Sequence, residues 1–146
     1  MITGAGTKNC SWAAREVDQG LADMFAGRTP EPYAPDWFNP DFGPDAAIRD
    51  EFAGLSNDAS FEAEYGSSFQ RSSMQAIADQ LQAAGNGARG LVGVTNGSTS
   101  HIFNAVNYGG EVFFIDGQTG AVWTNTQYMS GYAANSVVEF LPTAGF

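Results

Sequence analysis

The sequence has one cysteine, Cys10, and one histidine, His101, and these low counts exclude several kinds of site. A lone cysteine cannot form an intramolecular disulfide, so the fold does not depend on an oxidising compartment. One cysteine and one histidine cannot build a structural zinc site without carboxylates, and the sequence has neither a Cys-x-x-Cys spacing nor a second histidine for a facial iron site. We therefore expect a site that uses neither a metal ion nor another cofactor.

Basic residues are also scarce, since 6 Lys and Arg stand against 16 Asp and Glu and give a net charge of −10. Nucleic-acid binding depends on Lys and Arg that neutralise phosphates, so this balance argues against a nucleic-acid partner and against docking on anionic lipid. The acid is concentrated in residues 31–64, where Arg49 is the only base. This segment is either a solvated face or a docking surface for a basic partner. Its carboxylates are those of Glu31, Asp36, Asp41, Asp45, Asp50, Glu51, Asp58, Glu62 and Glu64.

Long apolar stretches are missing as well. No run approaches the length of a membrane span, and the amino end lacks a basic segment followed by an apolar one, so we predict neither a membrane span nor a signal peptide. The chain begins abruptly, close to Cys10, and we expect a domain of a longer protein. Its 146 residues, of which 43% are hydrophobic, suit one domain over residues 1–146.

Hydrophobic spacing predicts an α+β fold, with N-terminal helices packed on an antiparallel sheet. Apolar residues recur at helical spacing in 11–26 and 68–84, and 45–54 is predicted as a short helix. Segment 27–45 holds five of the six prolines and is predicted to be irregular, as is the polar, acidic segment 55–66. Strands are predicted at 89–95, 101–107, 111–115, 121–124 and 137–141, the last ending before Pro142.

A glycine pair, Gly109-Gly110, joins the second and third of these strands and suits a two-residue turn with positive φ at both positions. Such a turn places His101 opposite Gln118 and makes Asp116 a diagonal neighbour of His101 on the same face. A turn shifted one residue earlier would put His101 directly opposite Asp116. A three-residue loop would put the two side chains on opposite faces.

Cys10 stands at the start of the first predicted helix, on the same face as Ala14 and Val17. A helix amino-terminus and a nearby imidazolium both stabilise a thiolate, and a carboxylate on the far ring nitrogen orients the base. Taken singly, the three residues have ordinary explanations: a small buried hydrophobe, a core histidine and an Asp-Gly turn. Their combination predicts that Cys10, His101 and Asp116 meet as nucleophile, base and orienting acid.

Several strings of residues resemble the papain-fold toxin family of glutamine deamidases, whose members form the carboxyl-terminal domains of bacterial polymorphic toxins and secreted effectors. The resemblance extends over most of the chain. It is strongest in the block from the histidine to Gly120 and weak at the cysteine. The matching strings are Lys-Asn-Cys at 8–10, Gly-Leu-Val-Gly-Val at 90–94, His-Ile-Phe-Asn-Ala-Val-Asn at 101–107 and Phe-Ile-Asp-Gly-Gln-Thr-Gly at 114–120.

The resemblance implies a papain-like fold and a catalytic triad of Cys10, His101 and Asp116. Two features depart from related patterns. Cys10 lacks the Cys-Gly-Ser/Ala-Cys-Trp/Tyr signature of papain proteases, and Ser100 replaces the glycine that often precedes the family's histidine. The first departure argues against classical protease activity.

The implied reaction converts a glutamine side chain of a target protein to glutamate through a thioester on Cys10. We expect the backbone N–H of Cys10, with Asn9 or Gln118, to stabilise the oxyanion, although Gln118 is equally explained as a turn residue. The family also implies secretion or delivery by a bacterial secretion system, action in the recipient cytoplasm and a cognate immunity protein. Two alternatives remain: a papain-like cysteine protease, and a non-enzymatic binding module with the acidic segment as its interface.

Overall fold

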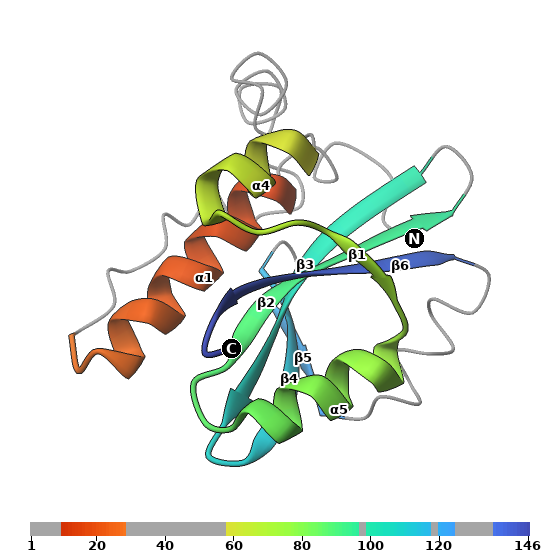
Figure 1. The fold of residues 1–146 in the computed structure, drawn as a ribbon. Coiled ribbons are helices and arrows are strands. Elements are labelled where there is room, and N and C mark those ends of the chain that lie inside the picture. Colours follow the sequence, from red (N-terminus) through yellow and green to blue (C-terminus); the bar gives the residue numbers. More distant parts are fainter. Residues whose placement is uncertain (1–9, 29–57, 97–98, 118–119, 125–135) are drawn as a thin grey trace.

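The computed structural model describes residues 10–28, 58–96, 99–117, 120–124 and 136–146. This part of the chain contains three helices and one six-stranded antiparallel sheet, so the predicted α+β class is confirmed (Figure 1). The elements in chain order are α1 (Cys10–Phe25), α4 (Asp58–Tyr65), β1 (Gln70–Ser72), α5 (Met74–Ala84), β2 (Arg89–Asn96), β3 (Thr99–Tyr108), β4 (Glu111–Asp116), β5 (Ala121–Trp123) and β6 (Val137–Ala144).

The strands follow the order β1-β6-β2-β3-β4-β5, and every neighbouring pair is antiparallel. The last strand of the chain, β6, is inserted between β1 and β2, so a late segment lies inside the sheet (Figure 1). β2 and β3 are the long central pair, and their register runs from Arg89 opposite Val106 to Asn96 opposite Thr99. Each of the five predicted strands is found, and β1 is added to them.

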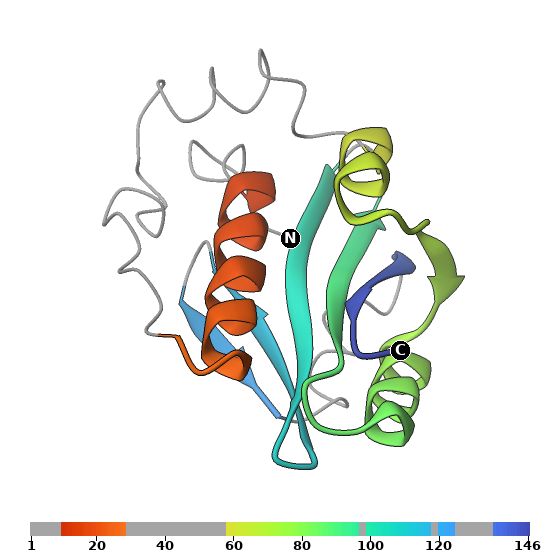
Figure 2. The ribbon, with the colours of Figure 1, turned by 60° about the vertical axis from the view of Figure 1, so that its left-hand side comes forward.

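The buried apolar side chains form two clusters. One contains Ile77 and Leu81 of α5 with Val92 of β2, and the other contains Ala14 of α1 with Leu91 of β2. Because Leu91 and Val92 are adjacent in a strand, they point to opposite faces of the sheet, and so do the clusters that they join. Figure 2 shows α1 and α5 on different sides of β3.

The prediction that segment 55–66 is irregular is wrong, because α4 lies within it. Phe61 of this helix is fully buried and meets Phe69 edge-on, with 6.2 Å between ring centroids. The guanidinium of Arg15 lies 3.8 Å from the centre of the Phe61 ring and pairs with Glu64 at 2.6 Å. These contacts come from elsewhere in the chain, so tertiary packing stabilises a helix that its own polar sequence does not indicate.

The helix predicted at 68–84 begins only at Met74, and β1 occupies part of the preceding segment. The change of structure occurs at Ser73, whose side-chain oxygen accepts a hydrogen bond from the Ala76 N–H at 3.1 Å and caps the helix. A three-residue strand is too short to show an alternating pattern, and β1 is extended because it pairs with β6. The predicted stop is confirmed by Gly85, which follows α5 at a φ of 97°.

β6 continues through Pro142 to Ala144, beyond its predicted end. Proline has no N–H to give to a sheet, so it is tolerated only at edges and bulges. In the described part of the chain, β1 covers β6 only as far as Phe140. The register with β2 also shifts at this point, because Gly90 faces Pro142 while Arg89 faces Ala144. Pro142 therefore occupies an irregular position beyond the end of β1.

Some predictions concern residues outside the described part. The short helix at 45–54 lies there, as does all but the first two residues of the irregular segment 27–45. Of the acidic segment 31–64, the structure describes only the residues from 58 onward.

The β3–β4 hairpin has the predicted register, with Tyr108 opposite Glu111 and pairing that continues in step along both strands. The turn residues Gly109 and Gly110 have φ values of 66° and 92°, the region that glycine adopts without strain. The buried Asn107 accepts a hydrogen bond from the Gly110 N–H at 2.9 Å and fixes the turn from inside. The even loop is confirmed, and with it the relative placement of residues farther along the hairpin.

Candidate active site

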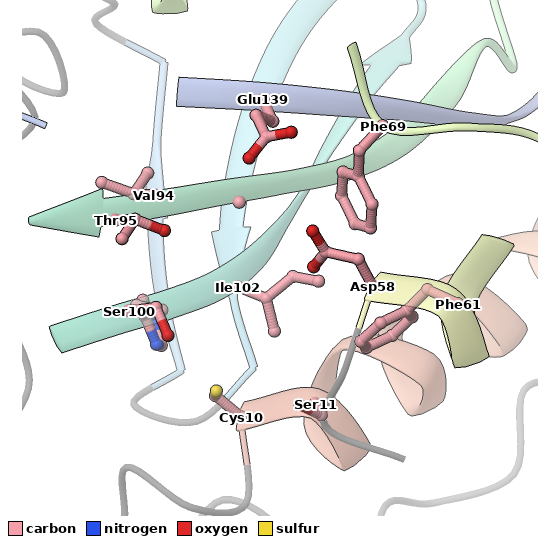
Figure 3. A pocket seen from close by; sticks show the side chains of 12 residues that line it. Cys10, Ser11, Asp58, Phe61, Phe69, Val94, Thr95, Ser100, Ile102 and Glu139 are labelled. Atoms are coloured by element: carbon pink, nitrogen blue, oxygen red, sulfur yellow. The ribbon is translucent and has the colours of Figure 1, made fainter. Parts of the chain in front are cut away.

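Cys10 is the first residue of α1, and 8% of its surface is exposed. The predicted buried face of the helix is confirmed, since Ala14 and Val17 are buried along with Cys10. Backbone N–H groups in a first helical turn have no intrahelical partner, and the helix dipole is positive there. Figure 3 shows the sulfur of Cys10 directed from the start of α1 into a pocket. The sulfur of Cys10 therefore lies at the amino-terminal end of α1, beside the backbone N–H groups of its first turn.

Two buried contacts hold α1 against the sheet. Asn104 of β3 donates from Nδ2 to the carbonyl oxygen of Ala14 at 3.0 Å. Gly117, which directly follows β4, lies so close to the helix that a Cβ there would be 2.7 Å from Val17 Cγ2 and 3.2 Å from the Ala13 carbonyl oxygen. The missing side chain at Gly117 therefore determines how near α1 comes to the end of β4.

We expect Gly117→Ala to lower the free energy of unfolding by about 1–3 kcal/mol, because the added methyl group overlaps Val17 and the backbone of α1. Chemical denaturation of the two proteins measures the difference. Val17→Ala removes the nearest atom, Cγ2. The double variant should therefore lose less free energy of unfolding than the sum of the losses in the two single variants. Equal denaturation midpoints for Gly117→Ala and the unmodified chain would contradict this packing argument.

His101 and Asp116 are in direct contact, with 2.9 Å between His101 Nε2 and Asp116 Oδ2. Both residues are buried, with exposed fractions of 3% and 4%. The contact follows from the hairpin register, which makes the first part of β3 and the last residue of β4 diagonal neighbours. The predicted meeting of these two side chains is confirmed, whereas their catalytic role is taken up below as a proposal.

The environment raises the pKa of His101 to about 9. Burial is the largest single influence and acts to lower this pKa, but the hydrogen bonds and charges of Asp116 and Cys10 together outweigh it. His101 is therefore protonated at neutral pH. Its Nδ1 has no hydrogen-bond partner of ordinary geometry among the described residues, while the Cys10 thiol is near enough to favour the imidazolium.

This arrangement can carry out nucleophilic chemistry. Asp116 holds Nε2 of His101, which leaves Nδ1 to exchange a proton with a group beside Cys10. Among the described residues, no group of three or more His, Cys, Asp and Glu side chains could hold a metal ion. Asn9 and Gln118, the two residues expected to support an oxyanion, lie outside the described part of the chain.

The pocket in front of Cys10 has a volume of about 100 Å³. It opens at the ends of β2 and β3 and is bordered by the starts of α1 and α4 (Figure 3). The residues that line it are Cys10, Ser11, Asp58, Phe61, Phe69, Gly93, Val94, Thr95, Ser100, His101, Ile102 and Glu139.

Sequence reasoning missed most of the pocket lining. Asp58 and Phe61 lie in a segment predicted to be a loop, and Glu139 lies on the last strand, far from Cys10 in sequence. Apart from Cys10 and His101, Gly93 is the lining residue that the sequence could have pointed to, because a glycine inside an apolar strand often marks a close approach or an open space. The others became neighbours of Cys10 through the strand order, which the sequence did not indicate.

The chain matches the family model described as papain fold toxin 1, glutamine deamidase, over residues 8–121. The matched range includes Cys10, His101 and Asp116. A search of curated proteins finds no match to the chain. No helix in the described part of the chain is long and apolar enough to cross a membrane.

Proposed function

Since this chain belongs to the papain-fold toxin family of glutamine deamidases, we propose that it converts a glutamine of a target protein to glutamate by cysteine catalysis. One observation carries the proposal. His101 is buried between the thiol of Cys10 and the carboxylate of Asp116, and both groups raise its pKa. This is the order of groups that nucleophilic attack by a thiolate requires.

In the first half of the reaction, the Cys10 thiolate attacks the carboxamide carbon of the glutamine. The electron pair of the C=O double bond moves to the oxygen and gives a tetrahedral oxyanion. The His101 imidazolium then passes its proton to the amide nitrogen, the C–N bond breaks and ammonia leaves. A thioester between Cys10 and the substrate remains.

In the second half, neutral His101 removes a proton from a water molecule, which attacks the thioester carbon. The C–S bond breaks, its electron pair returns to sulfur, and the product leaves as a carboxylic acid that loses its proton to solvent to become glutamate. The thiolate and the imidazolium are thereby restored. Asp116 keeps Nε2 of His101 engaged through both halves, so that Nδ1 faces the reacting atoms.

Oxyanion stabilisation completes the proposed mechanism. The backbone N–H of Cys10 belongs to the first turn of α1, where such groups are available to a ligand. We assign Asn9 and Gln118 as additional donors, since Asn9 directly precedes Cys10 and Gln118 lies two residues after Asp116 in the sequence. The helices on the antiparallel sheet would then form the papain-like arrangement, in a single domain over residues 1–146.

Mass spectrometry of cell extracts incubated with the protein tests the proposal. We expect new glutamates at glutamine positions in intact target chains, and no such change with Cys10→Ala. Extracts of bacterial and of eukaryotic cells should be compared, because they separate the two kinds of recipient. Cleaved peptide bonds in place of altered glutamines would identify a papain-like protease, and unchanged glutamines would refute deamidation.

The biological setting follows from the same membership and is part of the proposal. A member of a toxin family must leave the cell that makes it, so we assign delivery by a bacterial secretion system and action in the recipient cytoplasm. The producing cell then needs an immunity protein that covers or closes the site. The net charge of −10 argues against nucleic acid or anionic membrane as the target.

A further inference from the structure

We propose that the pocket beside Cys10 selects glutamines that have a lysine or arginine next to them in the target protein, and that Asp58 and Glu139 provide this selectivity. The inference rests on the proposed function, because it assigns a substrate class to the same pocket. Four features of the described residues support it: the shape of the pocket, its uncompensated charge, an aromatic ring and the buried His101 nitrogen at one end.

The pocket is a hollow in one row of residues across the sheet. Gly93 of β2 pairs with Glu139 of β6 on one side and with Ile102 of β3 on the other. Directly paired residues point to the same face, so the middle of this row has no side chain. Figure 3 shows Glu139 beside β2, with Asp58 extending from the start of α4 toward the same space. The two carboxylates thus lie in one pocket with Cys10.

Neither carboxylate is neutralised within the described part of the chain. Other acids there are paired with arginines: Glu64 with Arg15 at 2.6 Å and Asp18 with Arg89 at 3.3 Å. Asp58 and Glu139 have no such ion pair among these residues. Arg71 lies opposite Glu139 in the β1–β6 register but makes no ion pair with it. The far end of the pocket is therefore negatively charged and open to a cation from outside.

Two aromatic rings border the same end of the pocket, but Phe61 is fully buried under Arg15, so Phe69 is the ring that a ligand can reach. The methylene stem of a lysine or arginine packs well on such a ring, and its cationic head is attracted to the ring face. The molecule already contains this combination once. Arg15 lies over Phe61 at 3.8 Å and pairs with Glu64, so a guanidinium is held by a phenyl ring and a carboxylate next to the pocket.

The other end of the pocket is suited to the carboxamide. His101 is 3% exposed, and its Nδ1 has no hydrogen-bond partner of ordinary geometry in the described structure. The Cys10 thiol lies near this ring, so a carboxamide that reaches Cys10 also meets the Nδ1 proton of His101. A glutamine at Cys10 would leave the neighbouring residue of the target close to Asp58 and Glu139.

The net charge of −10 acts over a longer range and draws basic target surfaces toward the protein.

Peptide binding to the Cys10→Ala protein tests the selectivity without any chemistry. The probes are synthetic peptides with one central glutamine whose neighbours on both sides are arginine, alanine or glutamate. By calorimetry we expect the arginine peptide to bind about 10–100-fold more tightly than the alanine peptide, and the glutamate peptide most weakly. The preference should shrink as salt is added, because the pair is only partly buried.

Two variants on the same background locate the effect. Asp58→Asn/Glu139→Gln should remove the preference for arginine, whereas Asp79→Asn/Glu111→Gln, with the same change of charge on exposed acids outside the pocket, should retain it. Equal affinity for all three peptides, or a preference that survives Asp58→Asn/Glu139→Gln, overturns the proposal. Loss of the arginine preference in the control variant would also overturn the proposal, because the effect would then be due to net charge.

A narrower pocket gives a second test. A Cβ at Gly93 would meet only Phe69 Cε1, at an ordinary 3.7 Å, so Gly93→Ala should fold normally and weaken binding of every peptide. Unchanged binding would place the peptides elsewhere and refute the pocket as their site. The binding result is independent of the proposed reaction: charge selectivity without new glutamates would refute deamidation alone, and deamidation without selectivity would refute only the present inference.

Discussion

We expect Cys10→Ser to reduce kcat/KM for deamidation by about 10⁴–10⁶-fold while leaving the fold intact. Serine is nearly the same size as cysteine, so the buried start of α1 should pack as before. Its hydroxyl, however, is a weak nucleophile unless a base removes its proton. Asp116 still raises the pKa of His101 in this variant and favours the imidazolium, which cannot take the hydroxyl proton. The measurement is the rate of ammonia release from a glutamine substrate.

Ser11→Ala is the matched control for this variant. Ser11 is the next residue of α1, is buried and lines the same pocket, but its side chain has no part in the proposed chemistry. It should change kcat/KM by less than about tenfold. If Cys10→Ser keeps the activity of the unmodified protein, the thiol is not the nucleophile and the proposed mechanism fails.

The second large effect is expected from Asp116→Asn, which should lower kcat/KM by about 10²–10⁴-fold and shift its pH dependence. In the unmodified protein the reaction needs the His101 imidazolium, so kcat/KM should fall as the pH rises through about 9. Without the charge of Asp116, burial is less opposed and the pKa of His101 falls. The alkaline decline should therefore begin at a lower pH in the variant than in the unmodified protein.

The same pKa change has a consequence for stability. The folded-state pKa of His101 is raised above the value of 6.5 for the free side chain, so protonation stabilises the fold. This contribution is complete below pH 6.5 and is lost as the pH rises through about 9. Denaturation across this window should show a declining free energy of unfolding for the unmodified protein and a flatter profile for Asp116→Asn.

The exposed Glu111 at the other end of β4 offers a comparison for these profiles. Glu111→Gln removes the same charge and should leave the alkaline decline near pH 9. If Asp116→Asn also leaves it there, the charge of Asp116 does not hold the proton on His101. The lower kcat/KM of Asp116→Asn would then be due only to a changed orientation of the His101 ring.

Local rules were enough to predict the core of the candidate site. The helical spacing behind Cys10 gave the buried face of α1, and the pair Gly109-Gly110 gave the hairpin register that brings His101 to Asp116. Both follow from short stretches of sequence, because a helix period and a turn of known length fix which side chains share a face.

The rest depends on contacts between distant segments. α4 forms because Phe61 is buried against Phe69 and under Arg15. Both partners lie outside the helix, so the spacing of residues within α4 does not reveal them. The negative charge of the pocket depends on Glu139, which lines the same pocket as Cys10 only because β6 lies beside β2 in the sheet. Strand order is a property of the whole chain, so single-sequence patterns do not specify it.

The insertion of β6 between β1 and β2 also determines when the sheet around the candidate site can be completed. In the described chain, β1 has no strand partner other than β6, and Glu139 reaches the pocket only on that strand. A ribosome makes this strand after Cys10, His101 and Asp116, which all precede it in the chain. The nascent polypeptide therefore holds these three side chains before it holds the strand that completes the sheet around them.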